Sequence, residues 1–351
     1  MNDRKAIVAG GLGATGRPLI KRLRGDRGWN VVGISRRTPE VDLGVPFRSI
    51  DLLDREACES GLADLTDIEH IFFAAYTHFA DHAAVVEPNL RLLRNLVETV
   101  ESRSPTLRSV VLVEGAKYYG IHRGPIPTPT RESQPRISPP MFYYDQEDWL
   151  QQQQQEKSWW WSVVRPLGVC GFAVGNPQNI LTAIMVYGAI CRELGLPLRF
   201  PGSTTAYNAL RELTDADLLA QGMAWAATNS AAANETFNIA NGTYYRWSDL
   251  WPRLAAMFGV AVEAGEPFSL ADFMANKASV WDAMVAKYKL QPYGFDEIAA
   301  WPFADIFFAQ NYDALFDTSK ARRAGFQPFV DTEEMFQRYY RDWQRERILP
   351  A

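Results

Sequence analysis

The stretch Ala-Ile-Val-Ala-Gly-Gly-Leu-Gly-Ala-Thr-Gly, residues 6–16, decides how this chain folds. Its first four residues are apolar and predict a buried strand, and its glycines then follow the spacing G-x-x-G-x-x-G. Apolar residues recur at helical intervals over residues 17–23. A glycine turn between a strand and a helix is typical of a dinucleotide-binding site, because glycine lets the backbone approach a pyrophosphate and the helix N-terminus favours that anion.

Any tight strand-to-helix turn favours glycine, so this prediction depends on the flanking strand and helix as well as on the spacing. We expect these residues of the turn to contact the cofactor: Gly10, Leu12, Gly13, Ala14, Thr15 and Gly16.

The second predicted strand, residues 30–34, runs into Ser35, Arg36 and Arg37. In an NAD-selective fold, an acidic residue at this strand end binds the ribose 2′-hydroxyl. Two guanidinium groups and a hydroxyl attract a 2′-phosphate instead, so the sequence predicts NADP(H) rather than NAD(H). The alternative is a solvated basic turn, because arginine is common on protein surfaces.

Strands and helices alternate through the first half of the chain. Further strands are predicted at residues 47–50, 70–75, 109–113 and 159–164. The expected fold class is α/β, a Rossmann doubly wound parallel sheet with a smaller, mostly helical C-terminal lobe. We expect residues 1–170 to form the NADP-binding Rossmann domain, with later segments returning to it, and residues 171–351 to form the substrate-binding lobe. Helices are predicted at residues 82–102, 180–194, 214–227, 247–258, 267–287, 294–308 and 332–345.

Composition excludes several classes of protein. The 351 residues carry 36 lysines and arginines against 41 acidic residues, a net charge of −5, which gives no support to a nucleic-acid or anionic-membrane surface. The three cysteines are scattered and suggest neither a disulfide framework nor a zinc site. No signal peptide or bilayer-spanning apolar run is evident, so we expect a cytoplasmic enzyme with a small-molecule substrate; a homodimer is one option for its assembly.

Ligand contacts in such a fold gather at the carboxyl ends of the strands. Asp51 follows the third strand, where an acid can meet the adenine edge or, alternatively, cap the helix that begins near Asp54. His78 and His82 lie four residues apart without an evident third ligand, so no metal site is predicted. The remaining expected cofactor contacts, all near strand ends, are Asp51, Leu52, Ala74, Ala75, Tyr76, Gly115, Pro166 and Val169.

A phenol and an ammonium group are the candidate catalytic pair. Hydride transfer to a carbonyl or enone builds negative charge on the substrate oxygen, which a phenol donor stabilises, and a nearby ammonium lowers the pKa of that phenol. Lys117 stands after the fifth strand, and Tyr143 or Tyr144 opens the next helix. The Y-x-x-x-K pairing of short-chain dehydrogenases is absent, since Glu147 and Asp148 stand four residues after the two tyrosines. Between them, the proline-rich segment 122–140 is expected to form a stiff lid or binding wall.

Taken together, these stretches resemble one branch of the extended short-chain dehydrogenases, the progesterone 5β-reductase and iridoid synthase-like enone reductases. The Phe-Tyr-Tyr-x-x-Glu-Asp element, with Gly-x-Lys upstream, is specific to this branch, in which the lysine comes from the loop after strand five. The resemblance covers nearly the whole chain and is carried by residues 10–16, 35–37, 115–120, 142–148, 161–166, 198–202, 215–219 and 237–242.

The resemblance implies that NADPH delivers hydride to the β-carbon of an enone or enal, while Tyr143, supported by Lys117, holds the enolate oxygen and solvent protonates the α-carbon. Tyr144 is implied to be structural at the substrate pocket, although the residues alone leave it open as the catalytic phenol. Phe336 falls where the family tends to place a bulky pocket residue; the alternative is plain packing of an apolar helix face. A threonine is usual where Ala116 or Glu114 stands here, and such departures leave the substrate open.

Two other functions fit the same residues. A ketone or aldehyde reductase, or a sugar-nucleotide enzyme on this fold, would use the same tyrosine and lysine. A non-catalytic NADP(H)-binding sensor would need neither, and the retention of Lys117 and Tyr143 argues against it.

Overall fold

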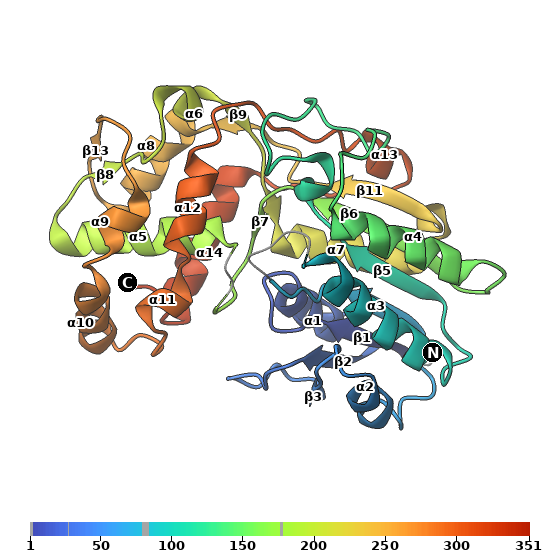
Figure 1. Cartoon of the computed structure of the whole chain (residues 1–351). Coiled ribbons are helices and arrows are strands. Elements are labelled where there is room, and N and C mark those ends of the chain that lie inside the picture. Colours follow the sequence, from blue (N-terminus) through green and yellow to red (C-terminus); the bar gives the residue numbers. More distant parts are fainter. Residues whose placement is uncertain (1–2, 27, 79–83, 176–177) are drawn as a thin grey trace.

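A computed structural model describes residues 3–26, 28–78, 84–175 and 178–351. Its centre is a sheet of seven strands in the order β11-β6-β5-β4-β1-β2-β3, and every neighbouring pair is parallel (Figure 1). The expected doubly wound α/β fold is therefore confirmed. The strands are β1 (Arg4–Ala9), β2 (Trp29–Ser35), β3 (Phe47–Ser49), β4 (His70–Phe73), β5 (Ser109–Val113), β6 (Trp160–Pro166) and β11 (Glu235–Ile239).

Helices cover both faces of this sheet. Successive side chains of a strand point to opposite faces, so Val8 of β1 packs in one core cluster with α1 (Gly16–Gly25) and α7 (Ala216–Thr228). Ile7 packs in the other cluster, with α3 (Val86–Glu101) and α4 (Phe142–Gln154). Burial on both faces explains why these strands are almost continuously apolar. A short helix, α2 (Arg55–Gly61), and a 3-10 turn, η1 (Ala116–Tyr119), lie in the connections.

The C-terminal lobe packs around one apolar helix, α5 (Ile180–Leu194), whose residues 180–191 are all buried. At Gly188 a Cβ atom would lie 2.2 Å from the ring of Phe258, so glycine permits the close crossing with α8 (Trp247–Phe258). The other helices of this half are α6 (Thr204–Asn208), η2 (Ser230–Ala232), α9 (Leu270–Met274), α10 (Ala278–Tyr288), α11 (Phe295–Ile298), α12 (Trp301–Phe308), α13 (Ser319–Arg323) and α14 (Thr332–Arg345).

Three two-stranded ladders complete the fold. They pair β7 (Val169–Cys170) with β10 (Thr214–Asp215), β9 (Leu210–Arg211) with β12 (Tyr245–Arg246), and β8 (Leu198–Arg199) with β13 (Val262–Glu263). Within the ranges described, no helix has the length and apolarity needed to cross a bilayer.

Most predicted helices are confirmed, and three of them (180–194, 247–258 and 332–345) match to the residue. The helix predicted from residue 214 begins two residues later, because Thr214 and Asp215 pair with β7 and Asp215 caps α7. The segments 267–287 and 294–308 each divide into two shorter helices. The start predicted at His82 lies outside the described residues, and α3 is described from Val86.

Candidate active site

The glycine turn between β1 and α1 has no room for a Cβ atom at Gly10 or Gly16. Gly10 has a φ of +78°, and a Cβ atom there would lie 2.5 Å from the Ala74 carbonyl oxygen at the end of β4. A Cβ atom on Gly16 would lie 2.2 Å from the Gly10 oxygen. The Gly10 N–H donates to the Ile34 carbonyl at 2.9 Å, which ties the turn to β2. The turn therefore brings the N-terminus of α1 close to the carboxyl ends of three strands.

A cleft of about 630 Å³ runs along these strand ends, a size typical of small-molecule sites. Three predicted cofactor contacts, Gly16, Gly115 and Pro166, are not among the described residues that line it. The predicted residues that do line it are Gly10, Leu12, Gly13, Ala14, Thr15, Ser35, Arg36, Arg37, Asp51, Leu52, Ala74, Ala75, Tyr76, Tyr143 and Val169.

Sequence reasoning missed several lining residues. Glu114 and Gln146 belong to this group, and their positions carried a signal, since Glu114 directly follows β5 and Gln146 lies one helical turn after Tyr143. Residues 173–175 line the cleft from an irregular segment after β7, where no periodic pattern could have marked them.

The basic end of the cleft lies at the end of β2. The side chains of Arg36 and Arg37 are exposed, and Arg37 Nη2 donates a long hydrogen bond of 3.4 Å to the Val174 carbonyl. For Arg36, no hydrogen bond or ion pair of the guanidinium is present in the described part of the chain. Both cations are therefore available to an anionic ligand in the cleft.

Asp51 lines the cleft beside them and does not cap α2. The cap is Asp54, whose carboxylate accepts from the Ala57 N–H at 3.0 Å, so the alternative role predicted for Asp51 is wrong. The loop after β4 is fixed by Asn89, which is fully buried and makes two hydrogen bonds of 2.9 Å with the backbone of Thr77.

Tyr143 lies in the first turn of α4 and lines the cleft. The Cβ position of Gly115 is 3.4 Å from the Tyr143 hydroxyl, so the loop that carries Lys117 packs directly against this phenol. The Tyr143 ring stacks on Phe142 at 4.2 Å, and Phe142 in turn contacts Tyr76 at 5.4 Å. The cleft therefore offers an aromatic wall made by Tyr76, Phe142 and Tyr143.

Burial raises the pKa of Tyr143 well above its usual value, and the nearby Glu114 and Tyr76 add to this effect. Lys117 is half-buried, and desolvation lowers its pKa. Among the residues described, its ammonium has no hydrogen-bond or ion-pair partner. The net direction for the phenol is thus opposite to the predicted lowering, because burial is the largest effect on its pKa and Lys117 is not among the charges that act on it. Tyr143 keeps its proton and is a hydrogen-bond donor.

The two residues predicted to line the substrate pocket take other places. The Tyr144 hydroxyl donates to the Tyr118 carbonyl at 2.6 Å and accepts from the Ile137 N–H at 2.8 Å, so it fastens the proline-rich segment to α4. Phe336 is 0% exposed in the core of the helical lobe, which corresponds to the packing alternative. Neither is among the described residues that line the cleft.

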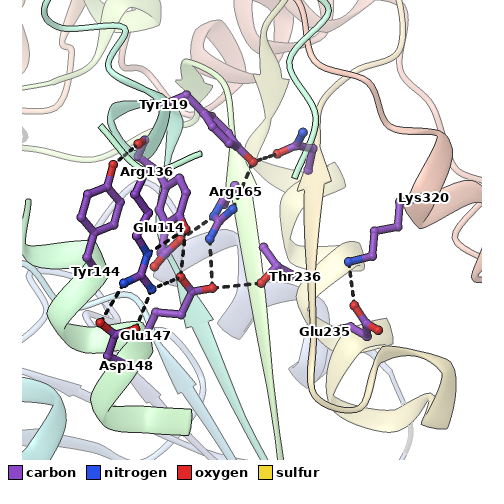
Figure 2. A network of polar contacts seen from close by, with 12 residues as sticks. Glu114, Tyr119, Arg136, Tyr144, Glu147, Asp148, Arg165, Glu235, Thr236 and Lys320 are labelled. Carbon is purple, nitrogen blue, oxygen red and sulfur yellow. Dashed lines mark hydrogen bonds and ion pairs between the residues drawn. The ribbon is translucent and has the colours of Figure 1, made fainter. Parts of the chain in front are cut away.

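A buried charge network surrounds Arg165, which contacts Glu114 of the cleft (Figure 2). Arg165 of β6 donates from Nε to Glu114 at 2.6 Å and from Nη2 to Glu147 at 3.0 Å. Glu147, on α4, also pairs with Arg136 at 3.0 Å and accepts from Thr236 of β11 at 3.2 Å. The network joins β5, β6, α4 and β11, and thus holds together the elements that carry the candidate catalytic residues.

A second cavity of about 630 Å³ lies on the far side of this network, and the proline-rich segment forms one wall of it rather than covering the cleft. Two of its cations are paired with carboxylates, Arg131 with Asp317 at 3.0 Å and Lys320 with Glu235 at 2.6 Å. We assign it no ligand.

Comparisons with known proteins agree with this geometry. A family model described as a PRISE-like Rossmann-fold domain matches residues 47–350. The chain is 32% identical over 338 residues to the 3-oxo-Delta(4,5)-steroid 5-beta-reductase of Arabidopsis thaliana, covering 92% of this chain and 86% of that protein. It is 34% identical over 322 residues to the (S)-8-oxocitronellyl enol synthase of Antirrhinum majus, covering 88% and 82%. Among solved structures, the UDP-glucose 4-epimerase of Thermus thermophilus in complex with NAD has a TM-score of 0.66 at 19% identity, covering 96% and 99%, which shows a shared fold.

Proposed function

Because this chain belongs to the family with a PRISE-like Rossmann-fold domain, we propose that it is an NADPH-dependent reductase of the activated C=C bond of an enone or enal. The resemblance drawn from its motifs is confirmed by its relatives, and the chain is an oxidoreductase of the short-chain dehydrogenase/reductase superfamily. The observation that carries the proposal is Tyr143, a phenol that burial keeps protonated and that lines the same cleft as the glycine turn.

The residues of the cleft fit a nicotinamide dinucleotide. The turn has no space for a side chain at Gly10 or Gly16, and the N-terminus of α1 carries no acidic residue in its first turn, so both favour a pyrophosphate. Arg36 and Arg37 favour the 2′-phosphate of NADP(H) over the bare hydroxyl of NAD(H). When bound, this cofactor supplies the hydride.

The chain itself controls charge on the substrate. As the β-carbon becomes saturated, negative charge develops on the carbonyl oxygen, and the Tyr143 hydroxyl donates a hydrogen bond to it. Lys117 lies on η1, two residues beyond Gly115, which packs against the Tyr143 hydroxyl; it is not among the described residues that line the cleft, and we assign its ammonium a supporting role beside this phenol. Solvent supplies the proton to the α-carbon, so one hydride and one proton together complete the reduction.

The test is oxidation of NADPH against cyclic enones, acyclic enals, saturated ketones and saturated aldehydes, with the products identified. Saturated carbonyl products are expected. Alcohol products would refute C=C reduction and make the protein a carbonyl reductase that uses the same phenol. Binding of NADPH without any turnover would favour the sensor function.

A further inference from the structure

One carboxyl group in the cleft has no role in the chemistry above. Glu114 directly follows β5, its side chain is 0% exposed, and it lines the cleft. Its Oε2 atom accepts from Arg165 Nε at 2.6 Å, whereas its Oε1 atom is buried without a hydrogen-bond partner in the described residues. Leaving a buried polar atom unpaired is costly, so a cleft-lining group of this kind indicates a partner among the ligands.

Burial favours the protonated form of Glu114, and the charges around it act in both directions. Arg165 of β6 pairs with Glu114 and also with Glu147 of α4. Two acidic side chains therefore share one buried guanidinium. The other titratable groups near Glu114 are Tyr118 and Tyr119 of η1, Arg136 of the proline-rich segment and Tyr143 of α4. Burial is the largest effect and raises the pKa of Glu114 to about 8; the Arg165 charge opposes this rise and the Glu147 charge adds to it.

A neutral carboxyl group changes what Oε1 can do. An ionised Glu114 would only accept hydrogen bonds and would repel an oxyanion, whereas the protonated group has an O–H that can donate. A carboxylic acid kept neutral by an apolar site is known physical chemistry for stabilising an enolate beside a tyrosine. Glu114 directly precedes Gly115, whose Cβ position is 3.4 Å from the Tyr143 hydroxyl, and both Glu114 and Tyr143 line the cleft.

We propose that Glu114 is a catalytic residue that donates a second hydrogen bond to the substrate oxygen, so that Glu114 and Tyr143 together stabilise the enolate. The inference rests on the proposed function, because it needs a substrate oxygen on which charge develops. The Glu114 proton stays on Oε1 throughout, and the proton that reaches the α-carbon still comes from solvent.

The variant Glu114→Gln tests this proposal, because an amide keeps the shape and donates at every pH. In the wild-type enzyme, kcat/KM for enone reduction is expected to fall as the pH rises through about 8, whereas E114Q loses this decline. Glu114→Ala removes the donor and is expected to lower kcat about 100-fold, with NADPH affinity unchanged. A decline that persists in E114Q and disappears in Lys117→Arg would assign it to the lysine and overturn the inference.

Glu147→Gln is the matched control, because Glu147 shares Arg165 but is not among the described residues that line the cleft. This variant is expected to keep the decline and move it to lower pH, since the Glu147 charge raises the pKa of Glu114. Infrared spectra of the cofactor-free proteins give an independent readout. When the E114Q spectrum is subtracted from that of the wild type, the band of one protonated carboxyl group is expected to remain. Absence of that band in the wild type would overturn the inference.

The two failures are distinguishable. A wild-type enzyme that forms no saturated carbonyl product refutes the proposed function, and the inference falls with it. A wild-type enzyme that reduces enones, while E114Q retains the same pH decline, refutes the role of Glu114 alone.

Discussion

Replacing Glu114 by glutamine also has a consequence for stability that needs no substrate. The pKa of Glu114 rises from its ordinary value of 4.5 to about 8 on folding. Between these pH values the folded protein holds a proton that the unfolded chain has released, so the free energy of unfolding falls as the pH rises through this window. Each pH unit of such a difference is worth about 1.4 kcal/mol, so full ionisation of this buried group costs roughly 5 kcal/mol.

E114Q carries no such proton. Its unfolding free energy is expected to equal that of the wild type near the acidic end of the window and to exceed it increasingly toward about pH 8. The assay is urea unfolding, followed by tryptophan fluorescence, of both proteins at several pH values. If the unfolding free energy of E114Q exceeds that of the wild type by roughly 5 kcal/mol, the urea midpoint is expected to rise by roughly 1 to 2 M.

Glu56→Gln is the control, because Glu56 is an exposed carboxylate in the first turn of α2. The plot of unfolding free energy against pH for this variant is expected to stay parallel to that of the wild type. If the E114Q curve is parallel as well, Glu114 is already ionised at the acidic end of the window, and the reasoning about its protonated form is refuted.

Three further substitutions test the cleft and the network behind it. Tyr143→Phe is expected to lower kcat about 100-fold or more while NADPH affinity is unchanged; Tyr244→Phe, at a 54% exposed tyrosine, is its control, and equal activity of the two variants would contradict the role of Tyr143. Arg36→Ala combined with Arg37→Ala is expected to raise the Kd of NADPH roughly 10- to 100-fold more than that of NADH; equal losses in calorimetric titrations would refute 2′-phosphate binding. Arg165→Met removes the buried guanidinium that donates hydrogen bonds to Glu114 and Glu147 and is expected to destabilise the fold by about 3–5 kcal/mol; an unchanged thermal midpoint would show that the network contributes no stability.

The features predicted correctly from sequence are those encoded over short distances. The glycine turn depends on a strand, three glycines and a helix within about 20 residues of sequence, and its geometry repeats wherever these occur. Helices α5 and α14 match their predicted bounds because Asn179 and Asp331 cap their first turns. Such signals need no knowledge of what lies across the core.

The errors and the missed residues depend on contacts between distant segments. The sequence around Thr214 and Asp215 is typical of a helix start. In the structure these two residues pair with β7 as a strand instead. The amphipathic pattern of α14 shows that Phe336 is buried, yet it does not show against what. Glu114 and Arg165 are 51 residues apart, so no local pattern could have revealed that they pair or that one oxygen of Glu114 stays unpaired.

The electrostatics of the cleft bear on the choice between C=C and C=O reduction. Reduction of a ketone leaves an alkoxide that must take a proton from its donor, whereas reduction of an enone leaves an enolate, a weaker base that needs only hydrogen bonds. Burial raises the pKa values of both Tyr143 and Glu114, which makes them weaker proton donors but leaves their hydrogen bonds intact. A site with two protonated groups that hold their protons favours the enolate. The ratio of saturated carbonyl to alcohol formed from one enone measures that preference, and a predominance of alcohol would refute the argument.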